Sequence, residues 1–267
     1  MHEIKFADIE SYKKEKNVAG LIEVFQSGDR FFKDIANALI DIGNEAVDPL
    51  IDVLKNEKPF IREEASRFLG AVGDDKAVKP LIALLTNDED CYVREEAARA
   101  LGNIKAEEAV EPLIQTLNDV DRYVREAASN ALGKIGNEAS ENALINSIND
   151  DDTYVRESIA RSLGRLGHEK SAKALITLLN DEDCYVREVV IRSLSKIGNT
   201  IAVVPLINVL NNDEDCYVRV AAVKALETLE TPEAIEALKE ATKFEDFGVA
   251  RAARKSLSKL GITIQKQ

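Results

Sequence analysis

One eight-residue phrase returns five times along this chain at an almost constant spacing. The clearest copies read DEDCYVRE and the looser ones DVDRYVRE or DDDTYVRE, and together they occupy residues 88–95, 119–126, 150–157, 181–188 and 213–220. From Arg94 to Arg219 the successive arginines of the phrase are 31, 31, 31 and 32 residues apart. One step backward reaches Arg62, whereas one step forward reaches Ala250, where the arginine is lost. A period of about 20–50 residues is typical of stacked repeats, so it outweighs the one or two compact domains that the chain length alone would suggest.

Each period contains two helical patterns, typified by residues 75–87 and 91–104. In both patterns the apolar residues recur at intervals of three and four, which predicts two amphipathic helices. An aspartate stands where the N-cap of the second helix belongs, at Asp90, Asp121, Asp152, Asp183 and Asp215. A glycine stands just past the end of the second helix, at Gly73, Gly136, Gly167 and Gly198. The short loops between the helices predict that the two pack antiparallel.

Proline and glycine each recur at one position inside these helices. Proline in the first helix removes a backbone hydrogen bond and is expected to kink that helix, at Pro49, Pro80, Pro112 and Pro205. A helical glycine costs about 1 kcal/mol relative to alanine, and it recurs in the second helix at Gly70, Gly102, Gly133 and Gly164. This recurrence predicts that a neighbouring helix passes close to each glycine.

The predicted fold is all-α, with about eight antiparallel helix pairs stacked in one continuous domain that spans residues 1–267. We place the pairs at about 17–43, 45–73, 74–104, 105–136, 137–167, 168–198, 199–230 and 231–261. An extra helix is expected at about 4–15. The first and last pairs deviate most from the pattern, as capping repeats do.

The segment AVKPLIALLTNDEDCYVREEAARALGNI (77–104) and its seven relatives resemble HEAT repeats. More narrowly, they resemble the short HEAT-like repeats of phycobilisome (phycocyanobilin) lyases. This resemblance covers nearly the whole chain. It implies a right-handed α-α superhelix, a HEAT/armadillo-like solenoid, in which the second helices line the concave side and usually meet a protein partner. It implies no single function, because a fold does not determine one.

The arginine of each phrase lies at the edge of the apolar arc of the second helix when positions advance by about 100° per residue. We expect its aliphatic stem to lie along the core while its guanidinium meets a loop aspartate of its own or an adjacent repeat. The resulting structural ladder comprises Arg62, Arg94, Arg125, Arg156, Arg187 and Arg219.

The aromatic residue two positions before that arginine lies near 160°, almost opposite the core. This aromatic row comprises Phe60, Tyr92, Tyr123, Tyr154, Tyr185 and Tyr217. Two mainly basic rows, five and nine positions after the arginine, share its face and include Arg67, Arg99, Asn130, Lys134, Arg161, Arg165, Arg192, Lys196 and Lys224. Solvent-facing tyrosine and arginine are common anchors of interfaces. We therefore predict that this face binds an acidic or amphipathic protein segment.

Structural explanations of the same residues stay open. Four glutamates precede basic residues by four positions, at Glu63, Glu95, Glu157 and Glu188. Such pairs stabilise a helix surface by about 0.2–0.5 kcal/mol each. A tyrosine near a helix start can also pack on the next repeat without binding anything.

Charge and composition limit the other functions. The formal net charge is −13, which disfavours broad binding to nucleic acid or anionic membranes. A DNA-binding HEAT-like solenoid remains an alternative because of the two basic rows. The sequence contains no apolar run of about 18 residues and no signal-peptide core, so we expect a cytoplasmic protein that does not span a membrane.

The sequence favours a protein without catalytic activity and without a cofactor or metal. Deoxyhypusine hydroxylases share this repeat type but carry paired His-Glu motifs, whereas here only His168-Glu169 stands in the expected place. A bilin lyase-like or other tetrapyrrole-handling role is the main enzymatic alternative. Cys91, Cys184 and Cys216 each begin a helix, where the thiol pKa is expected to be lowered. Clustered loop acids such as 88–90 lack the spacing of a calcium-binding loop.

Overall fold

The computed structural model describes residues 6–27 and 31–263. In chain order its α-helices are α1 (Phe6–Lys14), α2 (Val18–Ser27), α3 (Phe32–Ile42), α4 (Val47–Val53), α5 (Pro59–Val72), α6 (Val78–Asn87), α7 (Cys91–Ile104), α8 (Val110–Thr116), α9 (Arg122–Ile135), α10 (Glu138–Asn146), α11 (Thr153–Leu166), α12 (Glu169–Thr177), α13 (Cys184–Ile197), α14 (Val203–Asn212), α15 (Cys216–Leu229), α16 (Pro232–Ala241) and α17 (Phe247–Lys259). Short 3₁₀ turns join some of them, at Gly43–Ala46, Asp75–Ala77, Glu107–Ala109, Leu178–Asn180 and Thr200–Ala202. Residues 4 and 5 of the predicted extra helix lie outside the described part of the chain, and α1 forms residues 6–14 of it.

The prediction of an all-α, solenoid-type fold is confirmed. Within the described residues, helices follow one another in antiparallel pairs, from α2–α3 to α16–α17. The chain divides between Ser140 and Glu141, inside α10, into two compact units of stacked pairs. We call residues up to 140 unit 1 and residues from 141 unit 2, and we describe each by itself.

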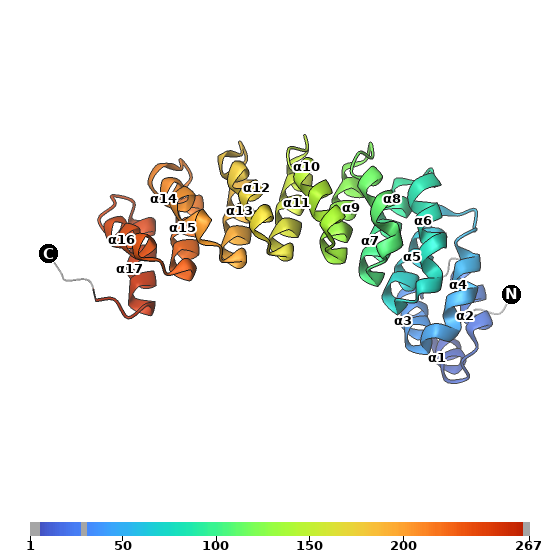
Figure 1. Ribbon diagram of the computed structural model, residues 1–267. Helices are drawn as coiled ribbons and strands as arrows, with labels where there is room; N and C mark the ends of the chain where they lie inside the picture. The colour runs from blue at the N-terminus through green and yellow to red at the C-terminus, as the bar shows by residue number, and fades with distance from the viewer. Residues whose placement is uncertain (1–5, 28–30, 264–267) are drawn as a thin grey trace. The chain divides into compact units, whose positions relative to one another are not determined.

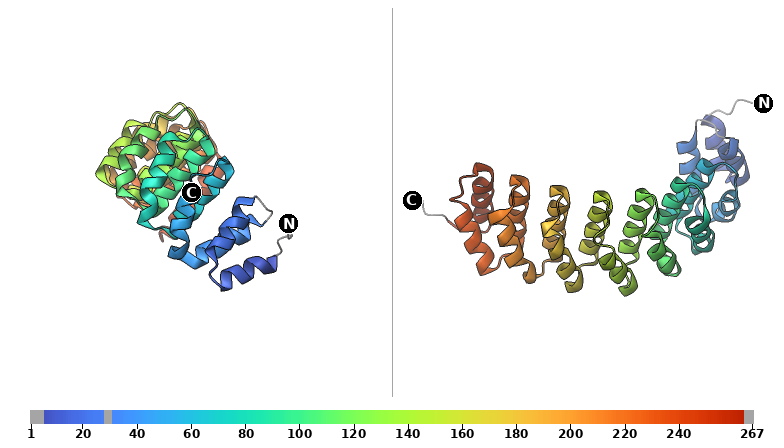
Figure 2. Two further views of the ribbon diagram at one scale, coloured as in Figure 1. Left: turned by 90° about the vertical axis from the view of Figure 1, so that its right-hand side faces the viewer. Right: turned by 90° about the horizontal axis from the view of Figure 1, so that it is seen from above.

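In each unit the helices form two layers (Figure 1). In unit 1 the second helices α5, α7 and α9 form one layer. In unit 2 the second helices α11, α13, α15 and α17 form one layer. The first helices form the other layer. In the right-hand view of Figure 2, the pairs of unit 2, coloured yellow to red, follow one another in chain order.

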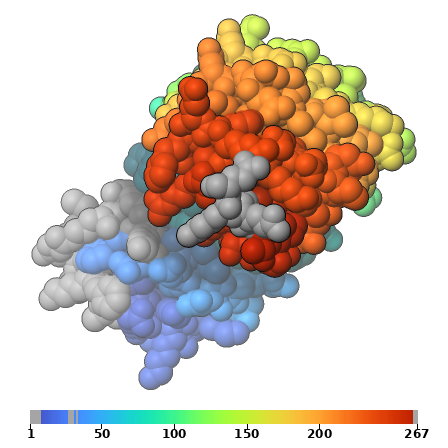
Figure 3. Space-filling view, turned by 90° about the vertical axis from the view of Figure 1, so that its left-hand side faces the viewer, coloured from blue at the N-terminus to red at the C-terminus, as the bar shows by residue number. Residues whose placement is uncertain are grey.

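The core lies between the layers and consists mainly of leucine, valine and alanine. In the α6–α7 pair, Leu81, Val93 and Leu101 are fully buried. Burying such a side chain contributes about 1.5–3 kcal/mol, so every pair gains stability from the pairs beside it. Figure 3 looks onto the end of unit 2, where α16 and α17 (red) cover the preceding pair (orange).

The second helices approach one another closely at the glycines, as the sequence predicts. A Cβ built on Gly70 would lie 2.6 Å from Cα of Ala100, and one built on Gly102 would lie 2.6 Å from Cα of Ala131. In unit 2, a Cβ on Gly164 would lie 2.6 Å from Cβ of Ser193. These contacts are too short for any side chain, so glycine permits this spacing of the layer.

The prediction that the recurring proline kinks the first helix is wrong. Each of the four prolines is the third residue of an α-helix that follows directly on a 3₁₀ turn, as in Asp75–Ala77 before α6. The amide of a residue in the first turn has no partner within the helix, so proline removes no bond there. α10 and α12 have no proline at this position and no 3₁₀ turn before them. The change of direction therefore lies in the turn and not inside the helix.

The glycines that end the second helices have the left-handed conformation that the sequence predicts. Gly73, Gly136, Gly167 and Gly198 have φ values between 72° and 79°. Two pairs lack this glycine, and there Lys105 (φ 59°) and Glu230 (φ 52°) adopt the same conformation. That conformation strains a residue with a side chain by about 1–2 kcal/mol.

Candidate protein-docking face

From α7 onward, the start of each second helix is fixed by a capping aspartate, whereas Lys58 before α5 makes no side-chain cap. In α7, Oδ1 of Asp90 accepts a hydrogen bond from the backbone N–H of Tyr92 at 2.9 Å. The equivalent bonds of Asp152 to Tyr154 (2.9 Å) and of Asp183 to Tyr185 (2.8 Å) lie in unit 2. Because the cap sets where the helix begins, it also sets the direction in which the tyrosine leaves it.

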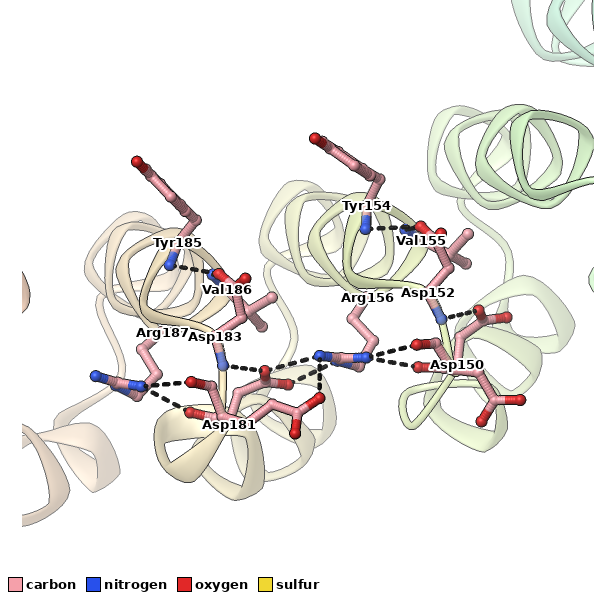
Figure 4. Close-up of polar contacts among 12 residues, drawn as sticks. Asp150, Asp152, Tyr154, Val155, Arg156, Asp181, Asp183, Tyr185, Val186 and Arg187 are labelled. Atoms are coloured by element: carbon pink, nitrogen blue, oxygen red, sulfur yellow. Dashed lines mark hydrogen bonds and ion pairs between the residues drawn. The ribbon is translucent and has the colours of Figure 1, made fainter.

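All six rings of the aromatic row point into solvent. Their exposed fractions range from 45% at Tyr123 to 75% at Tyr217. Figure 4 shows Tyr154 and Tyr185 projecting from equivalent turns of α11 and α13, on the side of the helices away from the ladder arginines. A seventh exposed ring, Phe247 at the start of α17, was missed because it stands one position before the row. Phe247 stands three residues before Ala250, whereas the rings of the row stand two residues before their arginine, and allowing for this shift would have revealed it.

Four of the ladder arginines each bridge two loops: Arg62, Arg94, Arg156 and Arg187. Arg156 binds the carboxylate of Asp181 in the next repeat through Nε (2.8 Å) and Nη2 (3.0 Å). Its Nη1 donates to the carbonyl oxygens of Asp150 (3.0 Å) and Asp151 (3.2 Å) in its own loop (Figure 4). The guanidinium therefore ties its own loop to the following one.

The same bidentate arginine–carboxylate contact recurs in both units. In unit 1 it joins Arg62 to Asp88 and Arg94 to Asp119, and in unit 2 it also joins Arg187 to Asp213. Arg125 donates from Nη1 to the carbonyl oxygen of Asp119 at 2.9 Å.

The last rung is weaker than the others. Arg219 binds Asp246 through Nη2 alone (2.7 Å), and its buried Nε has no partner among the described residues. Asp246 also caps α17, because this loop lacks the second aspartate that the other phrases carry.

The ion pair between Arg94 and Asp119 shifts the pKa of both groups. Burial alone would raise the pKa of Asp119, but hydrogen bonds from Arg94 and from the backbone N–H of Asp121, with the nearby positive charge, lower it below its usual range. Hydrogen bonding to Asp119 likewise raises the pKa of Arg94. Both groups therefore remain charged at neutral pH, as a charge-assisted pair requires.

The basic rows of unit 1 are surrounded by carboxylates. Arg67 contacts Glu63 at 2.9 Å, Glu64, and Glu96 of the next helix at 3.5 Å. Arg99 contacts Glu95 and lies 3.8 Å from Glu96. The face of unit 1 therefore carries little net positive charge around its arginines.

The other two predicted binding residues of unit 1 face their neighbours. Nδ2 of Asn130 donates to the carbonyl oxygen of Glu126 on its own helix at 3.1 Å. Nζ of Lys134 donates to Oδ1 of Asn103 on α7 at 2.6 Å. The contact of Lys134 could not be foreseen from the sequence because it depends on how the helices stack, whereas the bond of Asn130 lies within one helix.

In unit 2 the predicted cations gather. A surface hollow of about 250 Å³ between α11 and α13 is lined by Arg161, Arg165, Arg192 and Lys196 together with Val189 and Ser193. We call it the basic hollow; no described carboxylate belongs to its lining. Glu157 binds Arg161 at 2.5 Å and Glu188 binds Arg192, so each of these arginines has one carboxylate partner on its own helix.

A second hollow, of about 210 Å³, lies between α13 and α15. Buried Ile191, Ala221 and Ala225 form its apolar floor, and exposed Tyr217 stands at its edge beside Lys224. We call it the tyrosine hollow. Arg192 lines both hollows, so the two adjoin.

Cys91 and His168 each lie beside a carboxylate. The expectation of a lowered thiol pKa is wrong for Cys91, because burial and the carboxylate of Asp121 raise its pKa. His168 Nδ1 lies 3.0 Å from Oε2 of Glu141, and Oγ of Ser171 donates to Oε1 of Glu141 at 2.6 Å. Burial would raise the pKa of Glu141, but these hydrogen bonds lower it. Within residues 6–27 and 31–263 no three or more histidine, cysteine or acidic side chains are grouped as metal ligands would be.

Comparison with known proteins places the chain in a family. The sequence pattern of HEAT repeats matches residues 33–90, 78–158, 141–211 and 203–265, and the chain belongs to the HEAT-repeat family. No curated protein sequence is significantly similar to it.

Several solved structures share the fold. The Escherichia coli protein YibA is 20% identical with a TM-score of 0.66, over 97% of this chain and 98% of that one. An engineered protein is 23% identical with a TM-score of 0.56, over 95% and 80% of the two chains. The complex of CpcE and CpcF of phycocyanin lyase from Nostoc is 25% identical with a TM-score of 0.52, over 82% and 90%. The last similarity supports the narrower resemblance to lyase-type repeats.

The helices were also assessed for the ability to span a membrane. Among the described helices, none combines the length and the apolar character that crossing a membrane requires.

Proposed function

We propose that this protein is a non-catalytic, cytoplasmic scaffold that binds a partner protein through the exposed aromatic row on its second helices. The observation that carries the proposal is the solvent exposure of all six rings at equivalent turns. Exposed aromatic side chains have no role in the core, and tyrosine and arginine are enriched among the residues that supply most of the binding energy at protein interfaces. The partner chemistry that fits is an acidic or amphipathic segment.

Two further observations support this proposal. The capping bonds and the closely packed glycines hold the tyrosines on rigid helices, so little ordering cost remains when a partner binds. A similar HEAT-like protein occurs in the complex of CpcE and CpcF, which contains two proteins.

The proposal is tested by replacing Tyr123, Tyr154 and Tyr185 together with alanine. We expect circular dichroism to show nearly unchanged helicity, because these rings pack little against the fold. A pull-down from the native cell, read by mass spectrometry, should lose the proteins that the unchanged chain retains. The matched control replaces Ile201 and Val204, exposed apolar residues outside the second-helix layer, with alanine. Retention of the same proteins by the triple variant would contradict the proposal.

The similarity to a phycocyanin lyase complex favours one alternative, a tetrapyrrole-handling role. Mixing the protein with free bilin and recording the absorption spectrum distinguishes the two. A shifted spectrum that persists in the triple tyrosine variant would favour the alternative.

A further inference from the structure

The charge of the docking face differs between α5 and α7 of unit 1 and the second helices of unit 2 at one position. Two residues after the ladder arginine stand Glu64 in α5 and Glu96 in α7. At the same position α9 of unit 1 has Ala127, and unit 2 has Ser158, Val189 and Ala221. Glu64 and Glu96 are only 9% and 7% exposed and lie against the arginines of the basic rows. Without equivalent carboxylates, the basic hollow of unit 2 keeps a net positive charge.

The face of unit 2 also has an apolar part. The tyrosine hollow has a buried aliphatic floor and lies directly beside the basic hollow, with Arg192 common to both. A ligand that fits both hollows needs negative charge at one end and a large apolar group at the other. The tyrosine hollow has a volume of about 210 Å³, which fits one large side chain but not a folded domain.

We propose that unit 2 contains the specificity-determining part of the docking face, which binds an extended acidic segment of a partner protein. Carboxylates of the segment pair with Arg161, Arg165 and Lys196 in the basic hollow, and one large apolar side chain enters the tyrosine hollow beside Tyr217. This inference rests on the proposed function and adds the partner's chemistry and the location of the contact.

The geometry also sets the spacing within the partner segment. Helices of adjacent repeats pack about 8–10 Å apart, and an extended chain advances about 3.3 Å per residue. The apolar residue should therefore follow or precede the central acidic residue by about three positions.

A peptide fits this surface better than a nucleic acid does. The aliphatic floor of the tyrosine hollow offers nothing to a phosphate but gains from burying a leucine or phenylalanine side chain.

The test is a selection of phage-displayed random dodecapeptides on the immobilised full-length protein. We expect enriched peptides to be acidic, with one large apolar residue about three positions from the central acid. An enriched peptide is then synthesised with a fluorescein label, and its affinity is measured by fluorescence anisotropy. Selection of peptides without acidic residues, or of none above background, overturns the inference.

Charge-reversal variants locate the contact. Arg161→Glu with Lys196→Glu should weaken binding of the peptide at least tenfold. The matched unit 1 variant, Arg99→Glu with Lys134→Glu, should weaken it less than twofold. Val220→Trp, which places an indole at the tyrosine hollow, should remove the preference for the large apolar residue. Circular dichroism confirms that each variant is folded. Equal effects of the two charge reversals would overturn the inference.

Two outcomes separate this inference from the proposed function. If binding requires the tyrosines but not the unit 2 cations, the inference fails while the scaffold proposal stands. If a labelled DNA oligonucleotide binds as tightly as the peptide and competes with it, the face is a nucleic-acid surface and the inference is overturned.

Discussion

In unit 1 the ladder arginines Arg62 and Arg94 are each followed by two glutamates, whereas in unit 2 Arg156 and Arg187 are followed by one. The phrases of Arg94, Arg156 and Arg187 otherwise share a capping aspartate, an exposed tyrosine and a buried valine. The phrase of Arg62 has Phe60 and Ile61 at the last two positions and no side-chain cap. The ladder therefore has the same geometry in both units, while the charge of the docking face changes. One repeated scaffold can thus keep its stacking constant and vary its surface at a single position per repeat.

The largest expected effect tests whether the ladder is equivalent in the two units. Arg94→Ala in unit 1 and Arg187→Ala in unit 2 each leave a nearly buried aspartate without its partner. Breaking such a pair should lower the free energy of unfolding by about 3 kcal/mol in both cases. Urea unfolding followed by circular dichroism measures it. Arg219→Ala, which loses a single bond to Asp246, should cost less.

The pH dependence checks the same prediction. The pKa of Asp119 is lower in the folded protein than in the unfolded chain, so its stabilisation is fully present above about pH 4 and is lost as the pH falls through the folded pKa. The stability difference between the unchanged protein and Arg94→Ala should therefore shrink below about pH 4. A difference that stays constant down to pH 2 would show that Asp119 does not titrate with the ladder.

We expect an intermediate effect on peptide binding when the residue two positions after the ladder arginine is exchanged between the units. Val189→Glu gives unit 2 the carboxylate that unit 1 has at Glu96, and it should weaken binding of a labelled octaglutamate peptide about fivefold, or by about 1 kcal/mol. Glu96→Val should strengthen binding by a similar factor. Fluorescence anisotropy at low salt measures both. If neither substitution changes the affinity, the second glutamate does not control the charge of the face.

The smallest effect concerns the ends of the second helices, which should respond alike in both units. Lys105→Gly in unit 1 and Glu230→Gly in unit 2 relieve a strained left-handed residue and should each stabilise the protein by up to about 1 kcal/mol. Gly136→Ala and Gly198→Ala should destabilise it by about 1 kcal/mol. Thermal unfolding gives the order of the four variants. Opposite signs in the two units would mean that the helix ends are packed differently.

The sequence predicted the features that repeat with the period and depend on local geometry. Asp90 as a cap, Gly73 as a left-handed end and Gly70 as a close approach each follow from one helix and its spacing. The direction of the ladder could not be predicted, because an aspartate in the same loop and one in the next repeat stand at equivalent sequence positions. Only the stacked structure shows that Arg156 reaches forward to Asp181.

The charge of the face was missed for a related reason. Helical spacing pairs Glu63 with Arg67, but it does not show that Glu96 reaches across to Arg67 from the neighbouring helix. The doubled glutamates at 63–64 and 95–96 were the available signal. The hollows depend on gaps between helices and have no counterpart in a single helical pattern. Pro80 was misjudged because the 3₁₀ turn before it moves the start of the α-helix.

The forward reach of the ladder gives each stack a polarity. A repeat donates its arginine to the following repeat and offers its aspartate to the preceding one, as Arg156 and Asp181 do. Each internal repeat therefore carries both the arginine donor and the aspartate acceptor. A duplicated copy of about one period would fit between its neighbours without new contacts having to evolve. At position 250 alanine replaces the donor arginine, so adding a repeat after α17 would first require that arginine to be restored.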